Sequence, residues 1–332
     1  MVEKAFSALL EGLLRGERLF LSKAITLVET GNPALFPWRD RLLMEVEKLP
    51  ARETFRLAIT GVPGAGKSTL INQLGLQWIK EGHKVAVLAI DPSSEVSQGS
   101  VLGDKTRMAD LAREENAFIR PSPTRLHLGG VASSTFETIM LCEAAGYDRI
   151  LVETVGVGQS EQEASQLTDA CLLLLIAGAG DELQAVKRGI LESADVILIN
   201  KADGENKSRA ESYAKELKQV AAIWNEKVHG KPVEILAGSG IDAGMIIGLS
   251  GQLSRFEAHI REKGVLSQGR TRQKLGRAEV LIRQRLIEQM EIHPVWVSIC
   301  SDLDVNIKNN QQALFSALSE ACLKLKKLLE QS

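Results

Sequence analysis

Short apolar runs alternate with longer amphipathic stretches through the middle of the chain, from about residue 54 to about residue 260. Continuous apolar runs such as residues 171–176 are typical of strands in a parallel sheet that is buried on both faces. The amphipathic stretches, for example residues 135–145 and 207–224, have the spacing of helices. The pattern therefore predicts an α/β domain with a parallel sheet and helices on both faces. Its predicted strands are residues 55–60, 84–90, 149–153, 171–176, 196–200 and 233–236.

The two ends of the chain show helical spacing without this alternation. Near the N-terminus, apolar stripes are interrupted at Gly31-Asn32-Pro33 and resume over residues 38–48. Beyond about residue 265 no strand pattern is convincing, and helices are predicted at residues 272–289 and 313–329. We therefore predict three parts, namely a helical N-terminal extension (1–50), the α/β domain (51–262) and a helical C-terminal region (263–332).

A phosphate-binding loop is predicted directly after the first strand. The sequence there fits the pattern G-x-x-x-x-G-K-[ST], and a helix that runs to about Lys80 follows it. Glycines let backbone N–H groups turn toward phosphates, and a helix N-terminus adds partial positive charge. We expect Lys67 to reach the β- and γ-phosphates and the Ser68 hydroxyl to ligate Mg²⁺. The predicted site residues are Gly61, Val62, Pro63, Gly64, Ala65, Gly66, Lys67, Ser68 and Thr69.

The strand at residues 196–200 runs directly into an N-K-x-D pattern that predicts guanine as the base. Asp203 can accept hydrogen bonds from N1–H and the exocyclic amine of guanine, whereas adenine has no donor at either position. Such a site can discriminate by roughly 10⁴-fold, because adenine would leave a buried carboxylate unpaired. Asn200 is expected to brace neighbouring loops, and Lys201 to lie along the base plane. GTP and GDP are the predicted ligands; the competing interpretation is an ordinary polar turn after a strand.

A third loop that usually completes a guanine site is predicted after the last strand. Ala237, Gly238 and Ser239, with Gly240, follow the run at residues 233–236. They depart from the Ser-Ala pattern that is usual in GTPases. A base-contacting loop and a flexible Gly/Ser turn are both compatible with this composition.

Three acidic residues are candidates for Mg²⁺ coordination and, together with Lys67, for catalysis. Asp91 ends one predicted strand, Asp104 lies in the loop that follows, and Glu153 ends another strand. A cap and a surface charge are the alternatives for Asp91 and Asp104. Glu153 begins E-T-V-G, which resembles the D-x-x-G switch, so we expect Gly156 N–H to contact the γ-phosphate. No Gln follows Gly156 immediately, which predicts slow intrinsic hydrolysis and a stimulating cation from a partner.

Two further segments attract attention. The Gly-rich loop at residues 177–184 carries a pair of acids and is a candidate switch, although a plain connection from strand to helix is equally compatible. Residues 261–285 hold eight basic side chains, Arg261 and Arg270 among them, against two acidic ones. The default interpretation of this basic stretch is a solvated or dimer-facing helix, with docking of a partner protein as the alternative.

Composition and charge argue against several classes of protein. A net charge of −2 does not favour a general nucleic-acid binder. No apolar run reaches about 18 residues, so no membrane span is expected, and the charged first turns do not fit a signal peptide. The four cysteines are scattered without a C-x-x-C pair, as in buried side chains of a reducing compartment. We expect a cytoplasmic protein, or one of an equivalent organellar matrix.

Together these motifs resemble the MeaB/ArgK family of P-loop GTPases. The resemblance implies a homodimer with a helical N-terminal extension, a C-terminal dimerisation arm and a third switch at residues 177–188. It also implies a GTPase chaperone that gates cofactor delivery to an adenosylcobalamin-dependent acyl-CoA mutase, of the methylmalonyl-CoA mutase type, and protects or reactivates that enzyme. The mutase's cobalamin adenosyltransferase is a further implied partner. The matching stretches are residues 61–69, 85–94, 103–108, 118–121, 127–130, 141–147, 152–161, 177–184 and 200–204.

Two other functions share the phosphate loop. A kinase acting on a small molecule or protein would need an acceptor pocket with a base near the γ-phosphate, and no such base stands out. A metal-insertion GTPase usually displays His or Cys clusters, whereas residues 1–50 have neither and the five histidines of the chain are dispersed. Both alternatives remain open at the level of sequence.

Overall fold

The computed structural model describes residues 2–91, 108–123, 134–154, 160–178, 191, 193–221, 230–291, 293–308 and 314–331. The chain divides into two compact units, residues 1–273 and residues 274–332. The first unit contains the sheet and the helices that cover it. The second contains only helices among its described residues, so the predicted absence of strands beyond residue 265 is confirmed there.

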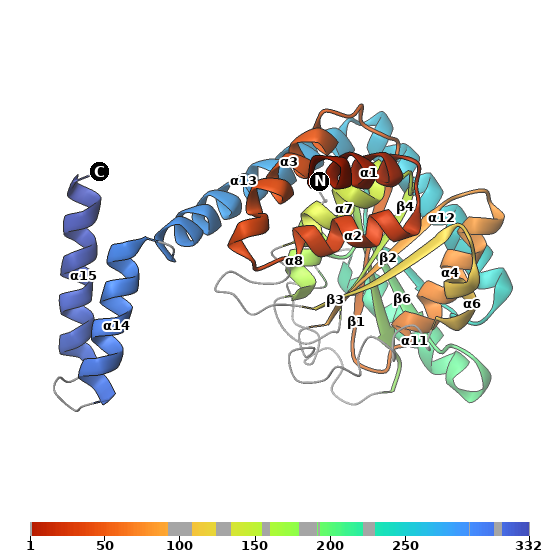
Figure 1. Ribbon diagram of the computed structural model, residues 1–332. Coiled ribbons are helices and arrows are strands. Elements are labelled where there is room, and N and C mark those ends of the chain that lie inside the picture. Colours follow the sequence, from red (N-terminus) through yellow and green to blue (C-terminus); the bar gives the residue numbers. More distant parts are fainter. Residues whose placement is uncertain are drawn as a thin grey trace. The chain divides into compact units, whose positions relative to one another are not determined.

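A seven-stranded parallel sheet forms the centre of the first unit within the described residues (Figure 1). The strand order is β3-β2-β4-β1-β5-β6-β7, and every neighbouring pair is parallel. All six predicted strands are present, and the predicted α/β architecture is confirmed. The strands are β1 (Phe55–Gly61), β2 (Val85–Asp91), β3 (Ala117–Pro123), β4 (Arg149–Thr154), β5 (Ala170–Ile176), β6 (Val196–Asn200) and β7 (Glu234–Ala237).

Strand β3 was not predicted, and its two prolines explain why. Pro121 and Pro123 cannot donate a backbone hydrogen bond, so the run does not read as a strand. In the structure β3 lies at the edge of the sheet and pairs with β2, with Ala89 opposite Pro121 and Asp91 opposite Pro123. An edge strand tolerates proline because one of its sides needs no partner.

The helices of the first unit follow the predicted alternation closely. Helix α4 ends at Lys80 as predicted, and the N-terminal extension forms the predicted helices on either side of Gly31-Asn32-Pro33. The helical segments are α1 (Val2–Leu14), α2 (Arg18–Val28), η1 (Pro33–Leu35), α3 (Phe36–Glu47), α4 (Lys67–Lys80), α6 (Ala109–Arg113), α7 (Thr135–Ala144), α8 (Ser160–Leu167), η2 (Gly204–Asn206), α11 (Lys207–Ala221), α12 (Ala243–Glu262) and α13 (Val265–Glu291), which continues into the second unit.

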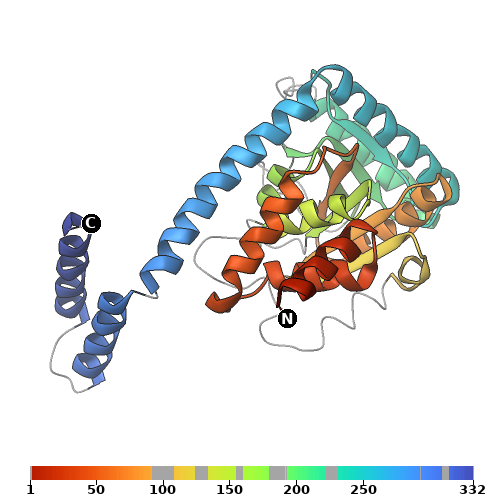
Figure 2. The ribbon, with the colours of Figure 1, turned by 45° about the horizontal axis from the view of Figure 1, so that its top comes forward.

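Alternate residues of the strands pack into different layers. On one face, Leu57 and Leu151 pack with helices α4, α6 and α12, and α4 and α12 lie side by side (Figure 2). On the other face, Ala58 and Val152 pack with α7, α8 and the N-terminal helices α1 to α3. Helix α11 covers β5, β6 and β7. The sheet is thereby buried on both faces, as its continuous apolar strands require.

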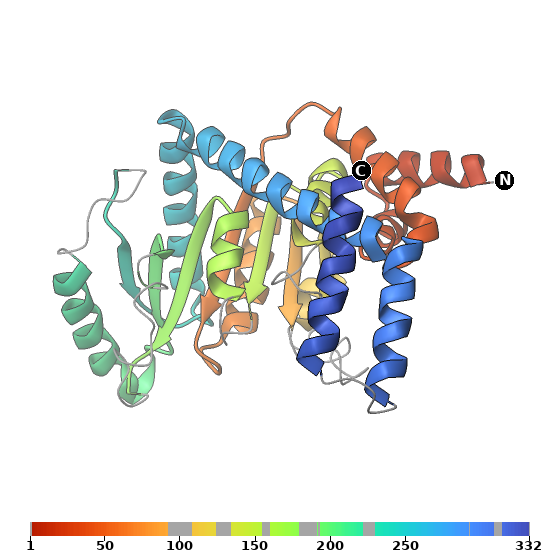
Figure 3. The ribbon, with the colours of Figure 1, turned by 90° about the vertical axis from the view of Figure 1, so that its left-hand side faces the viewer.

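The second unit contains two helices that lie side by side, α14 (Pro294–Lys308) and α15 (Leu314–Gln331) (Figure 3). Helix α14 was not predicted, because its β-branched residues, such as Val295, Val297 and Val305, have low helix propensity. Apolar side chains remain exposed along both helices, with Phe315 81% exposed. Among the described helices of the whole chain, none is long and apolar enough to cross a membrane.

Buried ion pairs hold the amino-end edge of the sheet. The Arg56 guanidinium contacts the Glu143 carboxylate at 2.8 Å, and Arg270 contacts Asp169 at 2.7 Å. Arg270 and Arg261 also both donate to the carbonyl oxygen of Thr54. The interpretation of the basic stretch as a solvated or dimer-facing helix is therefore wrong for Arg261 and Arg270. A linear sequence could not reveal this, because Thr54 and Asp169 lie about a hundred or more residues before the arginines that contact them.

These contacts shift the pKa of the Glu143 carboxyl. Burial raises the pKa of its carboxyl, but the charge of Arg56 and hydrogen bonds from Arg56 and Thr54 outweigh that effect. The net result is a pKa below the ordinary value of 4.5. Glu143 therefore stays ionised in the folded protein at neutral pH.

Candidate functional site

The candidate site lies where the carboxyl ends of β1, β4, β6 and β7 meet. Because all pairs are parallel, the segments that follow these strands emerge at the same edge of the sheet. Ligands of open α/β sheets bind at this edge. Helix α4 begins here, directly after the loop that follows β1. The fold thus brings together four segments that are separate in the sequence, at the carboxyl ends of β1, β4, β6 and β7.

Glycines shape the loop between β1 and α4. Gly66 has φ 89°, a left-handed conformation, and it forms the N-cap of α4. A Cβ at Gly66 would lie 2.8 Å from the Asn200 side-chain nitrogen, and one at Gly61 would lie 2.2 Å from the Leu174 carbonyl oxygen. Larger residues are therefore excluded at both positions. The first turn of α4 presents backbone N–H groups and the positive end of the helix dipole at this point.

The remaining predicted loop residues surround the helix N-terminus. Lys67 is only 8% exposed, and its ammonium donates to the carbonyl oxygens of Gly61, at 2.8 Å, and Val62, at 3.3 Å. Ala65 is buried, whereas Pro63, Gly64 and Thr69 are exposed. A cation is thus held inside the loop and beside the helix terminus. This arrangement suits an anionic phosphate chain.

Ser68 and Glu153 meet across the site. The Ser68 hydroxyl donates to Glu153 Oε1 at 2.9 Å, and Glu153 is 8% exposed. Because the hydroxyl hydrogen is directed at the carboxylate, lone pairs of Ser68 Oγ remain to accept a cation. Hydroxyl and carboxylate oxygens are the ligands that Mg²⁺ prefers. The donor set therefore fits the predicted metal, although no cluster of three His, Cys, Asp or Glu residues occurs within the described part of the chain.

Asn200 joins two loops of the site. Its side-chain nitrogen donates to the Ala65 carbonyl oxygen at 2.6 Å, and its side-chain oxygen accepts from the Gly240 N–H at 2.8 Å. The residue is 4% exposed. Lys201, which follows, has φ 58° and is the one non-glycine residue with positive φ among the residues described here. Such a backbone conformation is costly and recurs at functional sites.

The carboxylate of Asp203 lies against the loop that follows β7. Ser239 Oγ donates to Asp203 Oδ2 at 2.6 Å. The backbone also links these segments, since Gly238 N–H donates to the Ile199 carbonyl and Ala202 N–H to the Gly238 carbonyl. Asp203 remains exposed, so its carboxylate is accessible to a ligand. Sequence reasoning placed Ser239 near a base but missed this contact, which the pairing of β6 with β7 creates.

Some predicted site residues lie outside the described part. Asp104 and Gly156 are outside it altogether. Asp91 ends β2 as expected, but its side chain is not among those described. Ala237 ends β7, and it is half-buried. The structure thus brings together the phosphate loop, Glu153, the N-K-x-D segment and residues 237–240, while the roles of Asp91, Asp104 and Gly156 stay predictions.

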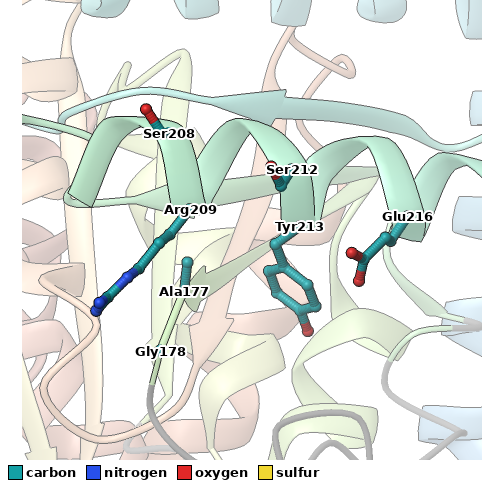
Figure 4. Close-up of a pocket in the computed structure, with 7 residues that line it drawn as sticks. All are labelled: Ala177, Gly178, Ser208, Arg209, Ser212, Tyr213 and Glu216. Carbon is teal, nitrogen blue, oxygen red and sulfur yellow. The ribbon is translucent and has the colours of Figure 1, made fainter. Parts of the chain in front are cut away.

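A separate pocket lies beside the end of β5. It has a volume of about 440 Å³, and Arg209 and Tyr213 extend from α11 on the side of the helix where Ala177 and Gly178 lie (Figure 4). Only Ala177 and Gly178 of the predicted switch at residues 177–184 are described. The lining residues are Ala177, Gly178, Ser208, Arg209, Ser212, Tyr213 and Glu216.

Known proteins resemble this chain over most of its length. The family model of the methylmalonyl Co-A mutase-associated GTPase MeaB matches residues 21–294. A probable GTPase of Mycobacterium tuberculosis is 41% identical, with 88% of this chain and 87% of that protein covered. The methylmalonic aciduria type A homolog, mitochondrial, of Mus musculus is 42% identical, with 85% and 70% covered. A crystal structure of an LAO/AO transport system kinase has a TM-score of 0.73 at 32% identity, with 98% of both chains covered.

Proposed function

The chain belongs to the family of methylmalonyl-CoA mutase-associated GTPases, and on that premise we propose that it is a GTP-driven chaperone of an adenosylcobalamin-dependent acyl-CoA mutase. It is a GTPase, like the members of that family and the relatives described above. The finer proposal is that GTP hydrolysis gates cofactor loading of the mutase and protects or reactivates it. The observation that carries the nucleotide site is the Asp203–Ser239 contact beside the phosphate loop.

Guanine recognition is proposed to depend on a carboxylate held in place before the base arrives. Ser239 engages one oxygen of Asp203, at 2.6 Å, and each carboxylate oxygen has further lone pairs for the N1–H and amine of guanine. Asn200 links this segment to the phosphate loop through Ala65. Base and phosphate contacts are thereby kept at a fixed separation, which lowers the entropic cost of binding.

The chain's own groups would stabilise negative charge on the phosphates. Lys67 and the N-terminus of α4 supply positive charge and N–H donors. Ser68 and Glu153 would hold Mg²⁺, with Asp91 and Asp104 as further proposed ligands. When bound, Mg²⁺ neutralises charge on the β- and γ-phosphate oxygens. Glu153 would also orient water near the γ-phosphate, and Gly156 would contact that phosphate.

The proposed output is a conformational state that a partner reads. The predicted switch at residues 177–188 begins at the pocket beside β5, so a client that contacts Arg209 or Tyr213 would lie close to it. A cation from that partner would compensate for the absence of a Gln directly after Gly156. Homodimer formation through the C-terminal helices is also proposed, since apolar side chains such as Phe315 and Leu318 are exposed there.

The test is binding and protection of a purified methylmalonyl-CoA mutase. The GTPase would be loaded with a non-hydrolysable GTP analogue, with GDP or with no nucleotide, and mutase retention and its rate of inactivation during turnover would be measured. Nucleotide-dependent retention together with slower inactivation is expected. Equal retention in all three states, with no protection, would contradict the chaperone role. Transfer of γ-phosphate to an acceptor other than water would instead favour the kinase function that the structural relative's name describes.

A further inference from the structure

Two buried threonines lie behind the nucleotide site. Thr154 Oγ1 donates to Thr60 Oγ1 at 3.0 Å, and the two residues are 0% and 1% exposed. Thr60 and Thr154 continue the alternation of Ala58 and Val152, which pack on the face covered by α7. Glu153 points to the opposite face, where it meets Ser68 of α4. The threonine contact is therefore separate from the proposed nucleotide contacts.

The position of this contact in the sheet is informative. The backbone register between β1 and β4 ends with Ile59 opposite Glu153. One residue further on, Thr60 pairs with Leu173 of β5, while Thr154 pairs with Ile90 of β2. At this level each strand keeps its pairing with its other neighbour, whereas the pairing between β1 and β4 has ended. The hydroxyl contact links β1 and β4 directly where their described backbone pairing has ended.

Each threonine adjoins a residue of the proposed site. Thr60 precedes Gly61, whose carbonyl oxygen accepts from Lys67, and Thr154 follows Glu153, which accepts from Ser68. A shift of β1 against β4 would change the separation of the phosphate loop and the Glu153 carboxylate. A displacement of about 1 Å at reacting groups can lower a rate by roughly 10²-fold.

We propose that Thr60 and Thr154 are positioning residues for GTP hydrolysis, whose hydroxyl contact fixes Glu153 relative to the phosphate loop. The inference rests on the nucleotide site proposed above. Among the described hydrogen bonds, that of the pair is distinct from those of Lys67, Ser68 and Asp203 in the proposed site. It should therefore affect the hydrolysis step more than nucleotide affinity.

The test compares Thr60→Val and Thr154→Val with Thr60→Ser and Thr154→Ser in the full-length protein. Valine keeps the shape and removes the hydroxyl, whereas serine keeps the hydroxyl. We expect each valine variant to lower kcat for GTP hydrolysis by about tenfold, with the Kd for GDP within about twofold of the parent. Serine should restore most of kcat. The matched control is Thr138→Val, because Thr138 is equally buried and its hydroxyl has no hydrogen-bond partner among the described residues.

The double variant Thr60→Val/Thr154→Val separates positioning from folding. Replacing both hydroxyls leaves no unsatisfied group, so its unfolding midpoint should recover toward the parent value while kcat stays low. Parent-like kcat in both single variants, or recovery of kcat along with stability, would overturn the inference. Glu153→Gln distinguishes the two proposals. If this variant keeps the parent kcat, the proposed role of Glu153 fails. If Glu153→Gln lowers kcat but the threonine variants do not, only the proposal for the threonine pair fails.

Discussion

Charged residues have different kinds of described contacts at the two ends of the strands, the amino-end edge and the carboxyl-end edge of the sheet. At the amino-end edge, buried charges meet opposite charges, as in the contacts of Arg56 with Glu143 and of Arg270 with Asp169. At the carboxyl-end edge, the described contacts of charged groups include neutral partners: Lys67 donates to carbonyl oxygens, and Glu153 and Asp203 accept from hydroxyls.

This difference separates stability from function. An ion pair in a buried site satisfies both of its charges within the protein, and removal of one partner strands the other. A contact with a hydroxyl or a carbonyl orients a charge without neutralising it. We therefore expect substitutions at the amino-end edge to reduce stability, and charge changes at the carboxyl-end edge to reduce nucleotide binding and hydrolysis.

Lys67→Ala should produce the largest effect, since it removes the cation inside the phosphate loop. We expect kcat/KM for GTP to fall on the order of 10³-fold, with the far-UV spectrum and unfolding midpoint close to the parent. Lys80→Ala is the control, because Lys80 is exposed at the other end of the same helix. If Lys67→Ala lost its fold together with its activity, the proposed separation of stability from function would be wrong.

Asp203→Asn should change base preference rather than remove binding. The amide can donate where the carboxylate accepted, so affinity for GDP should fall by roughly 10²-fold while xanthosine diphosphate gains. Titration calorimetry with both nucleotides measures the exchange. Glu205→Gln, an acid-to-amide change at a nearby exposed position, should leave both affinities unaltered. Unchanged GDP binding by the Asp203 variant would reject the base assignment.

Glu143→Ala should affect the opposite property. It leaves the buried Arg56 guanidinium without its carboxylate, so the free energy of unfolding should fall by about 3 kcal/mol. Nucleotide affinity of the folded fraction should be retained. Glu3→Ala provides the comparison, because Glu3 pairs with Arg41 at the surface and its removal should cost far less. Chemical denaturation of both variants would show whether the two losses differ.

The smallest expected effect is on the stability of the protein at acidic pH. Because the folded-state pKa of Glu143 lies below its ordinary value of 4.5, its contribution is complete above that value and is lost as pH falls through the folded pKa. The urea midpoint should therefore decline below about pH 4.5, and Glu143→Gln should make that decline shallower. Equal slopes in the parent and the Gln variant would show that Glu143 is not the group responsible.

Local patterns predicted much of the fold and of the site. The phosphate loop and N-K-x-D segment depend on residues adjacent in sequence, so their strand, loop and helix context could be predicted. Strand β3 escaped prediction because prolines mask an edge strand, and α14 because β-branched residues disfavour helices. The contacts of Arg261 with Thr54 and of Arg270 with Asp169 were missed, since side-chain composition does not identify distant partners.

The sequence by itself determined the architecture, the phosphate loop and the base-reading motif, because each is encoded within a few turns of chain. Only the tertiary structure decided which groups meet across strands: Ser239 with Asp203, Glu153 with Ser68, and Thr60 with Thr154. Those contacts depend on strand order and register, which arise from packing over the whole sheet.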